Sequence, residues 1–124
     1  MASSLDQYPQ RDGMYTLLSD SVAVHNRYQN RLIMLDALSS EVWLRADGRT
    51  TLRVIAGDLA GWLHQSTDSM LVAAPMVLMV LCSEGLMFQL DHPVDPPYHL
   101  CFPQEDQDAE QTHRSLIASG WLKP

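Results

Sequence analysis

The sequence predicts a single domain that is mainly α-helical and contains a small β-hairpin. The chain has 124 residues, the length of one domain, and 46% of them are hydrophobic, which is enough for one core. Apolar residues recur at helical spacing in several stretches, whereas residues 86–90 and 98–102 have the character of two short strands. The polar first residues and the short turns elsewhere predict a flexible arm at residues 1–13 and one domain at residues 14–124.

The first expected helix spans residues 21–38. Its apolar residues recur three or four positions apart: Val24, Tyr28, Leu32, Leu35 and Leu38. Asp20 and its serine neighbours supply oxygens that can cap a helix N-terminus. Farther along the chain, Asp47-Gly48 predicts a turn. Residues 42–44 lie before this turn and fit either a short strand or the end of a bent helix.

Two more helices are expected before the hairpin. The pair Thr50-Thr51 can cap the second, and a third follows over residues 70–83 with Asp68 or Ser69 as its cap. Proline fits best in the first turn of a helix. The alternative is therefore that the third helix begins at Ala73 or Ala74, just before Pro75. The predicted core residues lie on the apolar stripes of these two helices: Leu52, Ile55, Leu59, Trp62, Leu78 and Leu81.

Gly85 predicts the end of the third helix, since glycine commonly follows the last helical residue in the left-handed conformation. The two strands of the hairpin would then be joined by a proline-containing turn at residues 91–97. The acidic stretch 105–111 predicts the start of a last helix, because acidic side chains favour the positive end of the helix dipole. That helix would end by residue 118.

The order helix, helix, turn, helix, hairpin across Asn30–Phe102 resembles a winged helix-turn-helix. The segment Leu81-Cys82-Ser83-Glu84-Gly85-Leu86-Met87 is similar to the step of leucine, polar residues, glycine, leucine and an aliphatic residue at which many such regulators pass from recognition helix to wing. The resemblance implies that residues 74–83 are the recognition helix and that residues 91–97 form the wing tip.

The charge pattern argues against a groove-reading role for this helix. No lysine or arginine occurs between Arg53 and Arg114, and the net charge is −7. Affinity for nucleic acid comes largely from basic side chains that neutralise phosphates. We therefore expect a small acidic regulatory module that binds a protein partner, as an inhibitor, an adapter or a co-regulator. The partner-binding residues would be Met70, Met76, Met79, Met87, Glu105, Asp106 and Asp108.

The apolar third helix also allows the partner to be a second copy of the chain, because a helix that is apolar on all sides needs cover. The alternative is a DNA-binding transcriptional regulator that acts as a dimer. Its DNA contacts would come from the arginines near the first two helices: Arg27, Arg31, Arg45, Arg49 and Arg53.

Nothing in the sequence predicts an enzyme, a cofactor or a metal centre. His92, His99 and Cys101 contain ligand atoms for zinc, but their spacing matches no standard metal motif. The two cysteines, Cys82 and Cys101, are expected to be free thiols in a cytoplasmic protein, since the first residues lack the apolar core of a signal peptide. The longest apolar run has thirteen residues, at 70–82, and is too short to span a membrane.

Overall fold

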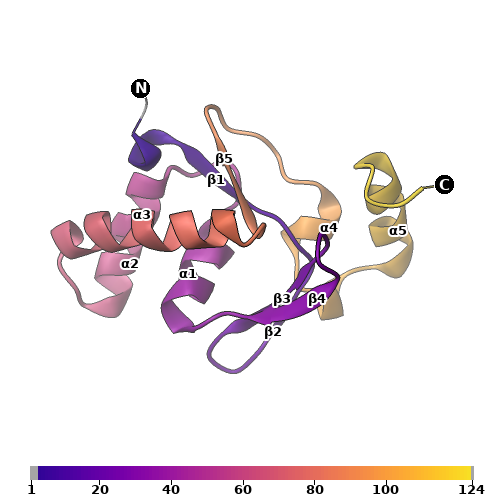
Figure 1. Ribbon diagram of the computed structural model, residues 1–124, viewed down its shortest axis with the longest axis horizontal. Helices are drawn as coiled ribbons and strands as arrows, with labels where there is room; N and C mark the ends of the chain where they lie inside the picture. Colours follow the sequence, from indigo (N-terminus) through magenta and orange to yellow (C-terminus); the bar gives the residue numbers. More distant parts are fainter. Residues whose placement is uncertain (1–2, 124) are drawn as a thin grey trace.

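The computed structural model of the protein describes residues 3–123. The helices in this range are η1 (Ser4–Asp6), α1 (Ala37–Arg45), α2 (Leu52–Leu63), α3 (Thr67–Ser83), α4 (Tyr98–Cys101), η2 (Gln104–Asp106) and α5 (Ala109–Ala118). The strands are β1 (Tyr8–Arg11), β2 (Tyr15–Leu17), β3 (Val22–Asn26), β4 (Arg31–Met34) and β5 (Met87–Leu90). Figure 1 shows α1, α2 and α3 at one end of the molecule and α4 and α5 at the other.

The protein is a single-domain mixed α/β structure. The strands form two antiparallel sheets, of order β1-β5 and β2-β3-β4. Helices hold 48% of the residues and strands hold 17%, so the expectation of a mainly α-helical domain with one small hairpin is too narrow. The additional strands come from the segments before residue 36, where the sequence had predicted only an arm and a helix.

The predicted helix at residues 21–38 is wrong. β3 places the side chains of Val22, Val24 and Asn26, at alternate positions, in the interior of the protein. The chain then turns and returns as β4. Asn26 stabilises the turn because its side-chain oxygen accepts hydrogen bonds from the backbone N–H groups of Tyr28 and Gln29. The apolar residues in this segment fit both a helical and an alternating pattern, and β-branched valines favour the strand.

The predicted second helix is confirmed, with Thr51 as its N-cap. α3 begins earlier than expected, since Ser66 caps it and it continues through Pro75. Residues 42–44 belong to the end of α1, which resolves the two possibilities left by the sequence. Gly85 follows α3 with a φ of +76°, the left-handed conformation expected after a helix.

The predicted hairpin of residues 86–90 and 98–102 does not form. β5 pairs instead with β1, from the segment that the sequence had predicted as a flexible arm. Residues 98–101 form the short helix α4. Three of the residues between β5 and α4 are prolines, which supply no N–H for a returning strand, whereas β1 contains one proline, Pro9, and pairs with β5 over all four of its residues.

The core lies where α2 and α3 meet, with Trp43 of α1 against them. Five of the six predicted core residues are buried: Leu52, Ile55, Leu59, Leu78 and Leu81. Trp62 is the exception, because its side chain is 60% exposed at the end of α2.

Among residues 3–123, no helix has both the length and the hydropathy required to cross a membrane.

Candidate functional site

The outer edge of β4 offers backbone groups for binding. Successive residues of an antiparallel strand turn their N–H and C=O groups to opposite sides. The N–H of Leu35 donates to the Val22 carbonyl at 3.0 Å, so the backbone groups of Ile33 also face β3. The backbone groups of Leu32 and Met34 therefore face away from the sheet. Both of their side chains are exposed, at 65% and 69%.

One side of α3 adjoins this edge. Arg31 at the start of β4 pairs with Glu84 at the end of α3, with 3.8 Å between nitrogen and oxygen. Val77, Val80 and Glu84 share one side of the helix by their spacing of three and four residues. Val80 is 56% exposed, whereas Val77 is half-buried against the core. The β4 edge surface consists of the outward backbone of Leu32 and Met34 with the side chain of Ile33, and the Arg31–Glu84 pair joins its start to the end of α3.

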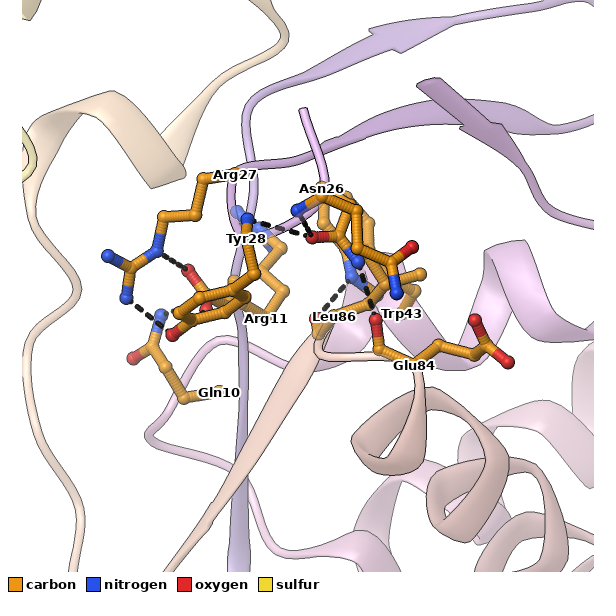
Figure 2. Close-up of polar contacts among 10 residues, drawn as sticks. Gln10, Arg11, Asn26, Arg27, Tyr28, Trp43, Glu84 and Leu86 are labelled. Atoms are coloured by element: carbon orange, nitrogen blue, oxygen red, sulfur yellow. Dashed lines mark hydrogen bonds and ion pairs between the residues drawn. The ribbon is translucent and has the colours of Figure 1, made fainter. Parts of the chain in front are cut away.

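Buried polar contacts fix the β3–β4 hairpin against the end of α3 (Figure 2). The side-chain nitrogen of Asn26 donates to the Glu84 carbonyl at 2.6 Å. The indole N–H of Trp43 donates to the Leu86 carbonyl at 2.9 Å. Both bonds hold the turn between α3 and β5, and the Asn26 bond also ties the β3–β4 hairpin to the end of α3.

A second cluster anchors the other side of the same hairpin. The carboxylate of Asp12 is buried and accepts from Arg27 at 3.3 Å and from the Tyr28 hydroxyl at 3.2 Å. Burial raises the pKa of Asp12, and the positive charge of Arg27 opposes that rise. The Arg27 guanidinium lies 4.5 Å from the ring centroid of Tyr28 and 4.1 Å from that of Trp121. The C-terminal segment is thereby fastened to the hairpin.

The methionines predicted to bind a partner separate into two groups. Met70 and Met87 are buried, at 8% and 4% exposure, while Met76 and Met79 are more than 60% exposed. Met87 nevertheless lines a pocket of about 620 Å³ together with Met76, Met79 and Cys82. This pocket lies on the side of α3 that faces β5, so it is a different surface from the β4 edge.

The predicted acidic partner residues lie away from α3. Glu105 and Asp106 belong to η2, and a Glu105 carboxylate oxygen accepts from the backbone N–H of Leu17 in β2 at 3.0 Å. Asp108 caps α5 by accepting from Gln111 N–H. The structure therefore does not join these three acids with the methionines into one site.

The five arginines of the DNA-binding alternative do not form one ridge. The turn at residues 47–48 separates Arg45 from Arg49 and Arg53. Each of the five lies within ion-pair distance of a carboxylate: Arg27 with Asp12, Arg31 with Glu84, Arg45 with Glu41, Arg49 with Asp95 and Arg53 with Asp6. Internal pairing leaves less positive charge for phosphates.

The histidine and cysteine considered as zinc ligands have other partners. His99 is fully buried, and its Nδ1 lies 2.7 Å from the Ser115 hydroxyl. Cys82 and Cys101 are free thiols, and Cys101 Sγ is 3.4 Å from the Pro97 carbonyl. Among residues 3–123, no three His, Cys, Asp or Glu side chains are grouped closely enough to hold a metal ion.

The buried His99 predicts a loss of stability in mild acid. Burial, and next the charge of Arg27, lower the pKa of His99 from 6.5 to about 4. The unfolded chain therefore binds a proton at a higher pH than the folded chain, so stability falls as pH drops from 6.5 toward 4. Between pH 7 and pH 5 this group should remove about 2 kcal/mol from the free energy of unfolding, measured by urea titration.

His99→Phe keeps a ring against Trp121 and cannot titrate, so it should lose most of this pH dependence. Asp12 titrates in both proteins, and its contribution cancels in the comparison. Replacing the exposed His113 with phenylalanine is the matched control and should leave the wild-type dependence. An unchanged slope in His99→Phe would show that another group is responsible.

Comparison of the chain with protein-family models, with curated proteins and with solved structures finds no match. The β4 edge surface is the part of the site that the sequence did not predict. The alternation of Val22, Val24 and Asn26, followed by the turn-forming residues Gln29-Asn30, is the signal that would have indicated this hairpin.

Proposed function

We propose that the chain is a protein-binding regulatory module that accepts an extended segment of its partner along the β4 edge surface. The observation that carries the proposal is the outward-facing backbone of Leu32 and Met34, whose side chains are both exposed. Unpaired strand edges are common sites of peptide addition, in which main-chain hydrogen bonds supply affinity and side-chain contacts supply specificity. The module would serve as an inhibitor, an adapter or a co-regulator.

The geometry of an added strand determines which partner segment fits the β4 edge surface. Each of Leu32 and Met34 has one N–H and one C=O directed outward, and a bound segment would pair with these groups. Alternate side chains of that segment would lie on the same face as Ile33. Ile33 packs partly against the core, so apolar residues at these alternate positions are the partner sequence that fits.

The winged-helix interpretation retains its three helices but loses its predicted wing, because β5 pairs with β1 and residues 98–101 form α4. α1, α2 and α3 follow one another before the turn at Gly85 and the strand β5, as in that fold. The helix in the recognition position has no basic residue, so its exposed valines and methionines favour a protein surface over a DNA groove. The ion pairs of all five arginines give the DNA-binding alternative less support.

The prediction that tests the proposal is the loss of peptide binding in Leu32→Pro. Proline removes the outward N–H, and an edge strand tolerates it because that N–H takes no part in the sheet. Peptides selected from a random library on the wild-type protein should bind the variant about tenfold or more weakly, as expected when one or two hydrogen bonds are lost. Isothermal calorimetry measures the difference.

Leu32→Ala is the matched control, because it keeps the N–H and shortens only the side chain. Hydrogen exchange should also slow at the amides of Leu32 and Met34 when a selected peptide is bound. Peptides that bind Leu32→Pro as tightly as wild type, with no protection at these two amides, would disprove addition at β4.

A further inference from the structure

A second pocket lies on a different part of the molecule from the β4 edge surface. It has a volume of about 700 Å³, within the roughly 300–1,000 Å³ range of ligand-binding pockets. The β2–β3 turn, α1 and the end of α2 enclose it. Its apolar lining consists of Leu17, Leu18, Leu38, Leu44, Trp62 and Leu63, and these six residues define the Trp62 pocket.

The Trp62 pocket has an exposed aromatic anchor. Trp62 is 60% exposed although it lies at the end of a helix whose other large apolar residues are mostly buried. The Arg45 guanidinium lies 5.6 Å from the centroid of the Trp62 ring, and Arg45 is already paired with Glu41. Tryptophan is among the residue types that most often dominate the energy of protein interfaces.

Negative charge surrounds the pocket. Asp20 belongs to its lining, and Asp58 precedes Trp62 by one turn of α2. Glu105 is held beside Leu17 by its hydrogen bond to that residue's backbone N–H. The end of α2 adds the negative pole of its helix dipole, while Asp36 caps the positive pole of α1. A basic partner is therefore favoured.

The backbone around the pocket favours a helical partner over an extended one. In β2, the N–H of Leu17 is taken by Glu105, and the N–H of Leu18 donates to the Ser21 carbonyl. These amides are not open to an added strand. A helix satisfies its own backbone and needs only an apolar face for the pocket.

We propose that the Trp62 pocket binds a basic amphipathic helix of a second protein. The leucines and Trp62 receive the apolar face of the helix, and lysine or arginine residues along its flanks meet Asp20, Asp58 and Glu105. This site is separate from the β4 edge surface, so the module can hold two partner segments at once. The inference is independent of the proposed binding at β4.

The probe for this proposal is a synthetic peptide with leucine at positions i, i+3, i+4 and i+7 and lysine elsewhere. A control peptide carries glutamate at every lysine position. The lysine peptide should bind the full chain, shift the indole N–H resonance of Trp62 and become more helical by circular dichroism. The glutamate peptide should bind at least about tenfold more weakly.

Trp62→Ala should weaken binding of the lysine peptide by about tenfold or more, the effect expected of an anchor residue. Phe88→Ala is the matched control, because Phe88 is another exposed aromatic residue, on β5, and its loss should leave binding unchanged. Leu32→Pro should also bind the lysine peptide normally, which separates this test from the one at β4.

Three results would overturn the proposal. Equal binding to wild type and Trp62→Ala would mean that the peptide is attracted by net charge alone. Equal binding of the two peptides would remove the preference for a basic partner. Concentration-dependent dimerisation in sedimentation that Trp62→Ala abolishes would make a second copy of the chain the occupant.

Discussion

Leu59→Ala is expected to lower the free energy of unfolding by about 2–5 kcal/mol, the range for truncation of a buried leucine. Leu59 lies in the middle of α2, is fully buried, and belongs to the core formed where α2 packs against α3. The cavity left by the lost atoms would be enclosed by side chains on two helices, which limits relaxation around it. A urea titration followed by circular dichroism measures the change as a shift in the midpoint.

The matched control is Val54→Ala in the same helix, at a position that is 52% exposed. Exposed substitutions of this kind usually change stability by within about 0.5 kcal/mol. If Leu59→Ala and Val54→Ala moved the midpoint equally, the buried side of α2 would be assigned incorrectly.

The buried side of α2 could be predicted from the sequence because its determinants are local. Leu52, Ile55 and Leu59 recur with the helical period, and the residue before them, Thr51, supplies the cap. Trp62 continues the same stripe but is 60% exposed, because it lies in the last turn of a helix that ends at residue 63. A periodic pattern gives the side of a helix, whereas burial depends on what packs there.

The β3–β4 hairpin could not be predicted from periodicity alone. Val24 and Leu32 fit a helical stripe as well as they fit alternating strand positions. What decides between the two is not local, since Asn26 is bonded to the carbonyl of Glu84, which lies 58 residues away in sequence. The pairing of β1 with β5 depends on contacts over a similar distance, and for that reason the sequence predicted an arm.

The candidate sites also divide into features that follow from the local sequence and features that depend on the assembled fold. The apolar pattern of α3 and the start of β5 grouped Met70, Met76, Met79 and Met87 into one partner surface, but only Met76 and Met79 are exposed, since periodicity does not show which side of an apolar helix the rest of the chain covers. The β4 edge surface was not predicted, because a free edge is a property of the assembled sheet. It depends on β4 being the last strand of its sheet among residues 3–123, and no single residue type indicates that in advance.

Arg11 is the clearest case of a residue whose role only the structure reveals. It is 7% exposed, and its guanidinium donates to three carbonyls: Leu44 at 2.7 Å, Leu100 at 2.9 Å and Cys101 at 3.2 Å. The rings of Tyr15 and Trp43 lie 5.5 and 5.8 Å from it. One side chain thus joins the end of α1 to α4 and fixes the C-terminal part of the chain.

Arg11→Met is expected to cost about 3–4 kcal/mol of unfolding free energy. Three carbonyls would lose donors in a buried region, and charge-assisted hydrogen bonds are stronger than neutral ones. Removal of the buried charge offsets part of that loss, since its own desolvation is unfavourable. Arg11→Lys should be intermediate, because an ammonium group cannot reproduce the planar fork that reaches three separate acceptors.

The control is Arg31→Met, which removes an exposed arginine whose ion pair spans 3.8 Å and should change stability by less than about 1 kcal/mol. Hydrogen exchange locates the effect, because amides of α4 and α5 should exchange faster in Arg11→Met while those of α2 reflect only the global loss. Wild-type stability in Arg11→Met would mean that the cost of burying the guanidinium cancels its three hydrogen bonds. In that case the C-terminal part would be held chiefly by the stacking of Arg27 between Tyr28 and Trp121.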